Sequence, residues 1–267
     1  MPPDPGPPAS PAETDPPTST AGPAAPRSLQ RFYEDPATPL SSGTERARLQ
    51  AGLLADHAVA AGRPLRGLDI GCGDGMATAV ALETAAARPG ATLRMVGCDW
   101  SLAGLGQADA RGVRVVRASI DEPGLPFGSG SFDVVVMSEL IEHLVDTDKA
   151  VAEAWRLLAP GGSLFLSTPN LAAWFNRVLL LLGIQPLFTE VSLGGIYGRP
   201  GKEVVGHLRL FTRRALLGFL EANGFVEVTI TGAPYHDVPR LFRPLDRLLC
   251  HLPGLSSILL ATARKPG

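Results

Sequence analysis

Residues 68–75 read Leu-Asp-Ile-Gly-Cys-Gly-Asp-Gly, and this stretch decides the fold. A short apolar run ends here in three glycines at alternate positions, Gly71, Gly73 and Gly75. Small residues follow from Met76 to about Ala87, as is typical of a packed helix. We therefore expect a buried strand, a tight glycine turn and the N-terminus of a helix. Such a turn lets a nucleotide-like ligand contact the backbone where a side chain would not fit.

An acidic residue closes the next predicted strand. This strand spans residues 93–98, and Asp99 follows it directly. A carboxylate at that position can accept hydrogen bonds from both hydroxyls of a ribose. The dinucleotide fingerprint Gly-x-Gly-x-x-Gly does not match, because Met76 stands where its last glycine would be. The spacing that the chain does show is Asp69-x-Gly71-x-Gly73-x-Gly75.

That spacing resembles the first motif of class I S-adenosylmethionine (SAM) methyltransferases. Four further segments extend the resemblance: Leu125-Pro126-Phe127 with the following run 131–136, Glu142-His143-Leu144, the run 156–162, and Ser167-Thr168-Pro169-Asn170. They follow one another in the order typical of the family and cover roughly residues 44–265. The resemblance implies an enzyme whose methyl donor is SAM.

Helical and strand patterns alternate along the chain. Helices are expected at 44–61, 76–87, 101–110, 139–145, 148–158 and 213–223, and strands at 65–70, 93–98, 113–118, 132–137, 164–167, 225–231 and 257–264. This alternation predicts an α/β fold with a doubly wound, mostly parallel sheet. The family resemblance adds that the sheet is seven-stranded and Rossmann-like, with an antiparallel edge strand.

Composition indicates one globular domain. The chain has 267 residues, of which 45% are hydrophobic and 19% charged, and its net charge is −2. This balance gives no broad surface for nucleic acid, so we expect a small-molecule acceptor rather than a nucleic acid. Three cysteines cannot all form pairs, which favours free thiols in a reducing compartment. We expect a cytoplasmic protein, and nothing in the sequence determines its oligomeric state.

The first 26 residues differ from the rest. They hold ten prolines and no basic residue, so we expect a disordered Pro/Ala-rich tail ahead of a methyltransferase domain at 27–267. They lack the basic and apolar regions of a signal peptide. The longest apolar run, Val178–Leu182, is too short to span a bilayer, so no transmembrane segment is expected.

The resemblance assigns SAM-binding roles to the residues around the glycine turn. It implies that Asp69 orients the loop and the methionine end of SAM, while the backbone of Gly71, Cys72, Gly73 and Gly75 lines the ligand. Asp99 is expected to bind the ribose. Trp100 either stacks on the adenine or is an ordinary half-buried tryptophan.

The residue at the adenine edge has two candidates. Counting from the strand gives Ser119, and counting back from Leu125-Pro126-Phe127 gives Asp121. We favour Asp121, with Ile120 packing on the ring. Ser138 and Glu139 follow the fourth predicted strand and are expected to face the methyl donor.

His143 is the candidate general base for removing the proton of the acceptor. On a helix over 139–146, Glu139, Glu142, His143 and Asp146 would share one face of about 100°. This pattern has two interpretations. It is either a solvated face opposite an apolar one, or half of a metal site with Glu139, Glu142 and His143 as ligands.

A later histidine bears on the metal interpretation. His207 precedes the helix at 213, and the set Glu139, Glu142, His143 and His207 resembles the metal-dependent 2′-O-methyltransferases that act on small-RNA 3′ ends. The Glu-x-x-Glu-His part also resembles ubiquinone-pathway O-methyltransferases. A lone His143 base is slightly favoured over a divalent metal, because a solvated helix face is a sufficient explanation of the pattern. An RNA acceptor is disfavoured, since no basic stripe is evident.

Residues 171–206 are long for a connection between a strand and a helix. Their apolar and glycine-rich composition predicts a lid over the substrate, although a packing decoration is the alternative. The sequence thus predicts a SAM-dependent methyltransferase that acts on a hydroxyl of a small or lipid-like metabolite, with specialised metabolism suggested by the Ala-, Pro-, Gly- and Arg-rich composition. The alternatives are an N- or C-methyltransferase, an RNA 2′-O-methyltransferase and a catalytically silent SAM-binding protein.

Overall fold

A computed structural model describes residues 44–121, 124–192, 195–201 and 206–267. The predicted tail at 1–26 lies outside the described residues, as do small parts of the predicted lid. Within the described residues, no helix combines the length and the apolar character that a membrane crossing requires.

A seven-stranded sheet in the order β3-β2-β1-β4-β5-β7-β6 forms the centre of the molecule. The strands are β1 (Leu65–Ile70), β2 (Leu93–Asp99), β3 (Arg114–Arg117), β4 (Phe132–Ser138), β5 (Leu158–Pro169), β6 (Val226–Ala233) and β7 (Ile258–Arg264). β1 to β5 pair in parallel, whereas β7 runs antiparallel to β5 and to the edge strand β6, between which it lies. The predicted mostly parallel, Rossmann-like sheet is confirmed.

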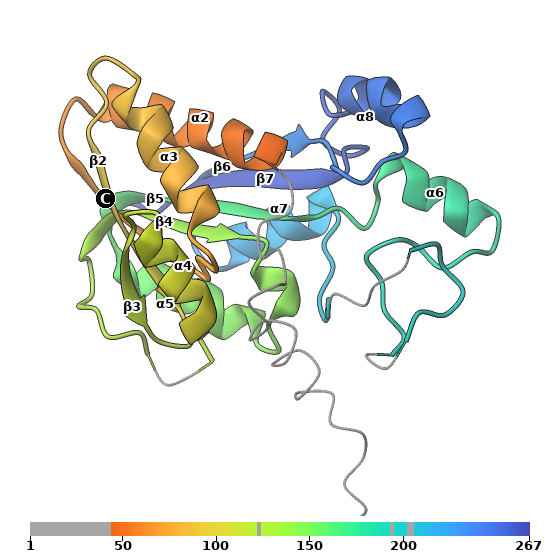
Figure 1. The fold of residues 1–267 in the computed structure, drawn as a ribbon, viewed down its shortest axis with the longest axis horizontal. Helices are drawn as coiled ribbons and strands as arrows, with labels where there is room; N and C mark the ends of the chain where they lie inside the picture. The colour runs from red at the N-terminus through yellow and green to blue at the C-terminus, as the bar shows by residue number, and fades with distance from the viewer. Residues whose placement is uncertain (1–43, 122–123, 193–194, 202–205) are drawn as a thin grey trace, which may run out of the picture.

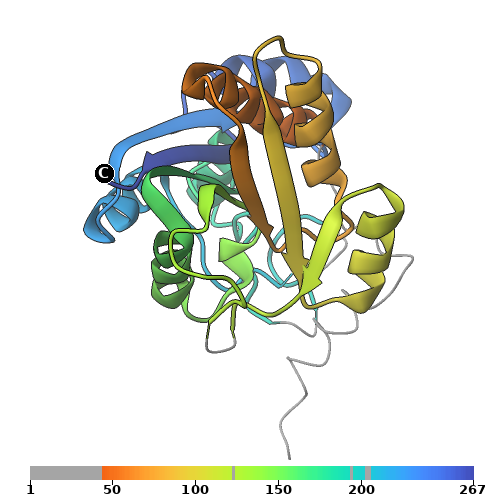
Figure 2. The same ribbon diagram turned by 90° about the vertical axis from the view of Figure 1, so that its left-hand side faces the viewer.

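Helices cover both faces of this sheet (Figure 1). They are α2 (Thr44–Ala61), α3 (Met76–Ala86), α4 (Leu102–Ala110), α5 (Thr147–Leu157), α6 (Trp174–Leu181), α7 (Arg213–Ala222) and α8 (Arg243–Leu249), with short 3-10 turns at η1 (Ile141–His143) and η2 (Arg240–Phe242). Seen from the side, α2 and α3 lie over one face and α5 lies under the other (Figure 2). α6 and α8 lie together at one end of the molecule (Figure 1).

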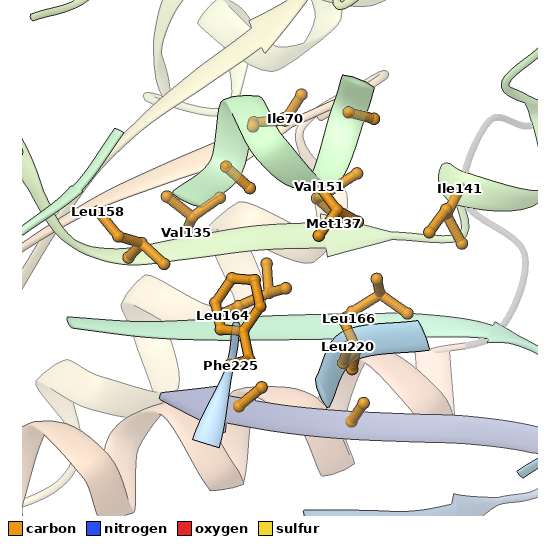
Figure 3. Packing of buried hydrophobic residues seen from close by; sticks show 14 of the residues in the cluster. Ile70, Val135, Met137, Ile141, Val151, Leu158, Leu164, Leu166, Leu220 and Phe225 are labelled. Atoms are coloured by element: carbon orange, nitrogen blue, oxygen red, sulfur yellow. The ribbon is translucent and has the colours of Figure 1, made fainter. Parts of the chain in front are cut away.

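The two largest clusters of the hydrophobic core form two layers, one on each face of the sheet. Along β4, Val135 and Met137 contribute to the layer under α5 and α7, and Val134 and Val136 to the layer under α2 and α3. This strand is apolar on both sides because parallel strands are covered on both faces. Figure 3 shows the larger layer, in which Leu164 and Leu166 of β5 pack with residues of the helices and of β1.

The order of the strands fixes where a ligand can bind. β1 pairs with β2 on one side and with β4 on the other. After β3 the chain therefore crosses back over β1 and adds its next strands on the opposite side of the sheet. Ligands of open α/β sheets bind at the carboxyl ends of the strands beside such a reversal. The glycine turn follows β1 directly and therefore lies at this place.

Two predicted elements differ from the structure. The helix expected at 139–145 is wrong, because only the 3-10 turn η1 forms there. The fifth strand is longer than the predicted 164–167, since β5 runs from Leu158 to Pro169 and includes Pro160. Its pairing with β4 shifts between Phe132 and Val134, which leaves an irregular section where a proline without an N–H is tolerated.

Candidate functional site

Three glycines with positive φ shape the turn after β1. The φ angles of Gly71, Gly73 and Gly75 are 74°, 53° and 74°, and Gly75 is the N-cap of α3. A Cβ on Gly75 would lie 2.6 Å from the Cβ of Ala108, and one on Gly71 would lie 2.8 Å from a methyl carbon of Leu140. The turn thus requires glycine for its conformation and for its close packing.

Asp99 links the end of β2 to this turn. Its carboxylate accepts hydrogen bonds from the backbone N–H of Gly73 at 2.9 Å and from that of Ser101 at 2.8 Å. Burial raises the pKa of this carboxyl group, while these two hydrogen bonds act in the opposite direction. Cys72 is buried beneath the turn, and its N–H donates to the carbonyl of Cys98. The turn and the end of β2 therefore form one hydrogen-bonded unit.

The candidate adenine-binding residues follow on neighbouring loops. Trp100 is half-buried directly after Asp99, and its carbonyl accepts a hydrogen bond from Arg117. Ile120 packs against the larger core layer, whereas Asp121 is exposed and its N–H donates to the hydroxyl of Ser119 at 3.2 Å. Ser119 and Asp121 thus lie on the same loop after β3, and the role of either stays a prediction.

Asp69 is buried one residue before the end of β1. It accepts a hydrogen bond of 2.5 Å from the hydroxyl of Thr78 on α3, and its second oxygen has no hydrogen-bond partner. Burial raises its pKa to about 6, against the opposing effect of the Thr78 bond. Gln50, Thr78 and Ser138 line a small cavity beside this carboxylate.

A polar group that the sequence analysis missed lies between α2 and the ends of β4 and β5. Arg46 is buried, donates to Ser167 at 3.2 Å and lies 3.9 Å from the Glu139 carboxylate. Gln50 accepts a hydrogen bond of 2.8 Å from Ser138. The signal in the sequence was Arg46 and Gln50 at i and i+4 on a helix whose other inward residues are alanine and leucine.

The stretch from 139 to 146 is not a helix with one polar face. Glu139 has a φ of 50°, and Asp146 is the N-cap of α5 rather than part of the cluster. Glu142 is fully buried, so the solvated-face interpretation is wrong for this residue. The segment turns sharply after β4 because the N–H of Glu139 donates to Ser167, which fixes this backbone to β5.

Three candidate ligands do come together. Glu142, His143 and His207 each offer one possible metal-binding atom, and these three atoms lie within 4.8 Å of one another. Thr168 donates to one oxygen of Glu142 at 3.1 Å, and the other oxygen is buried without a hydrogen-bond partner. Glu139 is not a member of this group, although its charge contributes to the raised pKa of Glu142 after the larger effect of burial.

Both histidine rings are held by backbone carbonyls. Nδ1 of His143 lies 3.3 Å from the oxygen of Gly206, and Nδ1 of His207 lies 3.1 Å from the oxygen of Phe188. Since a carbonyl oxygen can only accept, each neutral ring carries its hydrogen on Nδ1 and its lone pair on Nε2. Burial lowers the pKa of His143 to about 3 and that of His207 to about 4, so both rings are neutral near pH 7.

A buried ion pair within the predicted lid positions His207. Glu190 accepts hydrogen bonds from the N–H groups of Gly206 at 2.7 Å and His207 at 3.2 Å, and from Arg199 at 3.2 Å. Both charged side chains are almost fully buried. The sequence analysis missed this pair, and its signal was an acidic residue, Glu190, between the apolar residues of a long insertion.

A family model described as a methyltransferase domain matches residues 42–230. The chain belongs to the SAM-dependent methyltransferase family. The ubiquinone biosynthesis O-methyltransferase of Burkholderia cenocepacia is 30% identical over 230 residues, which are 82% of this chain and 91% of that protein. A protein with the same description from Rhizobium johnstonii is 36% identical over 115 residues, which are 40% of this chain and 44% of that protein.

Solved structures of methyltransferases share the fold. A SAM-dependent methyltransferase from Archaeoglobus fulgidus matches with a TM-score of 0.52 and 16% identity, over 82% of this chain and 94% of that chain. The 1,6-didemethyltoxoflavin N1-methyltransferase of Burkholderia thailandensis matches with a TM-score of 0.50 and 23% identity, over 84% and 80%. The predicted family, the fold and the enzyme class are therefore confirmed.

Proposed function

We propose that this methyltransferase transfers the methyl group of SAM to a hydroxyl group of a small, largely apolar acceptor. The observation that carries the proposal is the buried cluster of Glu142, His143 and His207 at the carboxyl end of β4. The relative from Burkholderia cenocepacia is described as an O-methyltransferase, which supports an oxygen acceptor. The aromatic and apolar side chains of the predicted lid support an apolar one.

SAM would lie along the glycine turn, with its ribose on Asp99. The turn brings backbone without bulky side chains to the N-terminus of α3, and Asp99 has oxygen lone pairs beyond those that Gly73 and Ser101 use. The methionine end of SAM carries a carboxylate, and the buried cation beside Ser138 and Glu139 is Arg46. We assign Arg46 to that carboxylate and Asp69 to the ammonium side of the same moiety.

The reaction needs alignment and the removal of one proton. The acceptor oxygen attacks the methyl carbon, the bond between carbon and sulfur breaks, and its electron pair stays on sulfur. The acceptor hydroxyl loses its proton in the process, so a group that favours the oxyanion accelerates the transfer. We place the acceptor hydroxyl beside the cluster of Glu142, His143 and His207.

A lone His143 base fits this site poorly. A general base works best with a pKa near the working pH, whereas burial holds the pKa of His143 near 3. Its Nδ1 is also engaged with the carbonyl of Gly206. The slight preference for a metal-free base therefore reverses once the burial of this ring is known.

A divalent cation fits the residues present. The cluster offers a carboxylate with one unpartnered oxygen and two neutral imidazoles whose Nδ1 atoms are held by carbonyls, which is the usual outer support of metal-binding histidines. Glu142, His143 and His207 would hold the ion, with Glu139 beside them. When bound, such an ion lowers the pKa of an acceptor hydroxyl and orients its oxygen. The protein residues fix the cluster, exclude water and hold the lid over it.

The test compares His207→Ala with the exposed-histidine control His251→Ala, using methyl-labelled SAM and metal-depleted protein. Transfer in wild type should disappear with a chelator and return with Mg²⁺, Mn²⁺ or Zn²⁺. His207→Ala should lose transfer, whereas its SAM affinity and that of the control should stay unchanged. Full activity of His207→Ala in the presence of chelator would contradict the metal proposal and leave the methyl transfer itself intact.

We further propose a cytoplasmic location, which the three free thiols of Cys72, Cys98 and Cys250 support. The structure of the methylated product distinguishes the proposed oxygen acceptor from a nitrogen or a carbon acceptor. A silent SAM-binding protein is disfavoured, because it has no need for a buried carboxylate beside two buried imidazoles.

A further inference from the structure

Helix α8 presents its apolar residues to solvent and its acidic residue to the interior. Leu248 is 65% exposed, and Leu241 of the preceding turn η2 is 83% exposed. Asp246, by contrast, is 1% exposed. A surface helix normally shows the opposite arrangement, with leucines inward and charges outward. The outer face of α8 is therefore better suited to contact with an apolar partner than to contact with water.

Both oxygens of the buried Asp246 carboxylate accept hydrogen bonds. Its Oδ1 accepts hydrogen bonds from the Trp174 indole at 2.9 Å and from Ser257 at 2.5 Å, and its Oδ2 accepts the N–H of Tyr235 at 3.0 Å. These bonds connect α8 to α6 and to the segments next to β6 and β7, which fixes the rotation of α8 about its axis. The exposure of the leucines is thus fixed by hydrogen bonding and does not result from a loosely placed helix.

Helix α6 continues the same surface. Leu181 at its end is 87% exposed, and Leu180 and Leu182 beside it are exposed too. The Trp174 ring of α6 packs on Phe242 of η2 at 6.0 Å, so the two helices form one unit at the end of the molecule (Figure 1). We call this surface the α6–α8 face. Each of the two segments contributes several exposed leucines, more than the scattered single apolar residues of an ordinary surface.

Positive charge accompanies these leucines. The two segments 174–182 and 240–252 carry four exposed arginines, Arg177, Arg240, Arg243 and Arg247, and their single acidic residue is the buried Asp246. Arg247 forms an ion pair of 3.1 Å with Glu45 of α2, which leaves the other three arginines as the positive charge of this face. The chain as a whole has a net charge of −2, so the concentration of positive charge on this face is local. Apolar side chains with interspersed arginines match an interface of acyl chains and anionic headgroups.

We propose that the α6–α8 face docks on the surface of an anionic lipid bilayer. A second copy of this chain is the other occupant to consider. In a twofold contact the same face meets itself, so the arginines of one copy would approach those of the other. An anionic bilayer instead attracts Arg177, Arg240 and Arg243 while it buries the leucines.

A chain of packed aromatic rings connects this face with the candidate active site. Trp174 contacts Phe175, Phe175 contacts Phe188, and Phe188 contacts His207, with ring centroids 5.5, 5.9 and 6.1 Å apart. Because α6 lies within the predicted lid at 171–206, docking would bring part of this lid to the lipid surface. This consequence rests on the proposed function, whereas docking itself does not.

Sedimentation with vesicles tests the docking. Wild-type protein should bind vesicles of phosphatidylcholine with roughly a third phosphatidylglycerol, and far less to phosphatidylcholine alone. The variant with Leu181→Ser, Leu241→Ser and Leu248→Ser should lose more than about tenfold in binding. The variant Arg240→Gln should weaken binding and reduce the dependence of binding on salt. No binding of wild type to the anionic vesicles would overturn the proposal.

Matched variants separate docking from general surface effects. The control triple Leu49→Ser, Leu102→Ser and Val226→Ser removes exposed apolar residues elsewhere and should bind as wild type does. Thermal unfolding and SAM affinity of each variant show that the fold is retained. Equal loss in the control triple would overturn the proposal. A dimer in sedimentation velocity that the α6–α8 triple abolishes, without vesicle binding by wild type, would show that a second copy covers the face.

Discussion

At the scale of single residues, Asp99 connects the glycine turn to the expected ribose. Its two oxygens already accept the N–H groups of Gly73 and Ser101, so it shapes the turn and offers its remaining lone pairs to the ligand. A substitution at this position therefore affects both the turn and the ligand. An alanine and an asparagine separate the two contributions, because asparagine keeps an acceptor oxygen.

We expect Asp99→Ala to weaken SAM binding by ~1.5–3 kcal/mol, the typical value of a hydrogen bond to a charged group. Asp99→Asn should weaken it less. Isothermal calorimetry with SAM measures both, and Asp109→Asn, which changes an exposed acid on α4, is the control. Unchanged affinity in Asp99→Ala would refute the ribose assignment.

Asp69 gives a prediction on pH. Its pKa in the folded protein is about 6, against 3.8 for the free group. Between these values the folded state retains a proton that the unfolded state has lost, so stability falls as the pH rises through this window. The total loss is ~3 kcal/mol, at ~1.4 kcal/mol for each unit of pKa shift.

Urea denaturation at several pH values tests this sign. Asp69→Asn keeps an acceptor for Thr78 and has no proton to lose, so its stability should decline less between pH 4 and 6 than that of wild type. Asp109→Asn should follow wild type. An identical slope in wild type and Asp69→Asn would show that Asp69 titrates normally.

At the scale of elements, we expect the predicted lid at 171–206 to depend on the ion pair of Glu190 and Arg199. This pair is buried, and Glu190 also binds the N–H groups of Gly206 and His207. Removal of one member of such a pair leaves a buried charge uncompensated, which typically costs ~3–5 kcal/mol. The position of His207 should be lost at the same time.

Glu190→Ala should therefore lower the free energy of unfolding and abolish methyl transfer, while SAM affinity stays unchanged because the glycine turn is a separate element. The double variant Glu190→Ala with Arg199→Met should recover stability but not transfer. Urea denaturation, SAM calorimetry and a transfer assay measure the three quantities, with exposed Glu221→Ala as the control. Wild-type transfer by Glu190→Ala would exclude a positioning role for this pair.

The turn after β4 shows what periodicity alone can miss. The sequence pattern at 139–146 fits a helix, but Ser167 of β5 binds the backbone of Glu139, and Glu139 adopts a positive φ. Glu139 and Ser167 are 28 residues apart, so a local sequence pattern does not reveal this contact. The helix α2 and the strand β1, by contrast, match their predicted bounds, because local patterns of apolar residues and the glycine turn specify them.

At the scale of the whole molecule, the sequence predicts the part of the site that belongs to the glycine-turn motif. The glycine turn and Asp99 lie on consecutive elements of the chain, and the order of strands brings them together in every doubly wound sheet. Arg46, Glu190 and Arg199 reach the site from a preceding helix and from an irregular insertion. Their approach depends on tertiary packing, which no local pattern in the sequence encodes.

The predicted tail belongs to this scale. Residues 1–26 carry too little apolar surface to dock on the domain, so their deletion should leave the melting temperature and SAM affinity almost unchanged. Differential scanning calorimetry and SAM calorimetry on the shortened chain measure this. A fall of the melting temperature by many degrees would show that the tail packs on the domain.

The chemical nature of the acceptor is the central proposal, and the structure of one methylated product tests it most directly. An extract of the organism that makes this protein would be incubated with pure enzyme and with SAM that carries a deuterated methyl group, and the labelled product would be identified by mass spectrometry and NMR. We predict a deuterated methyl ether on an apolar small molecule, formed only without chelator or after a divalent ion is restored. A label on nitrogen or carbon, or no labelled product in any extract fraction, would contradict the proposed hydroxyl acceptor.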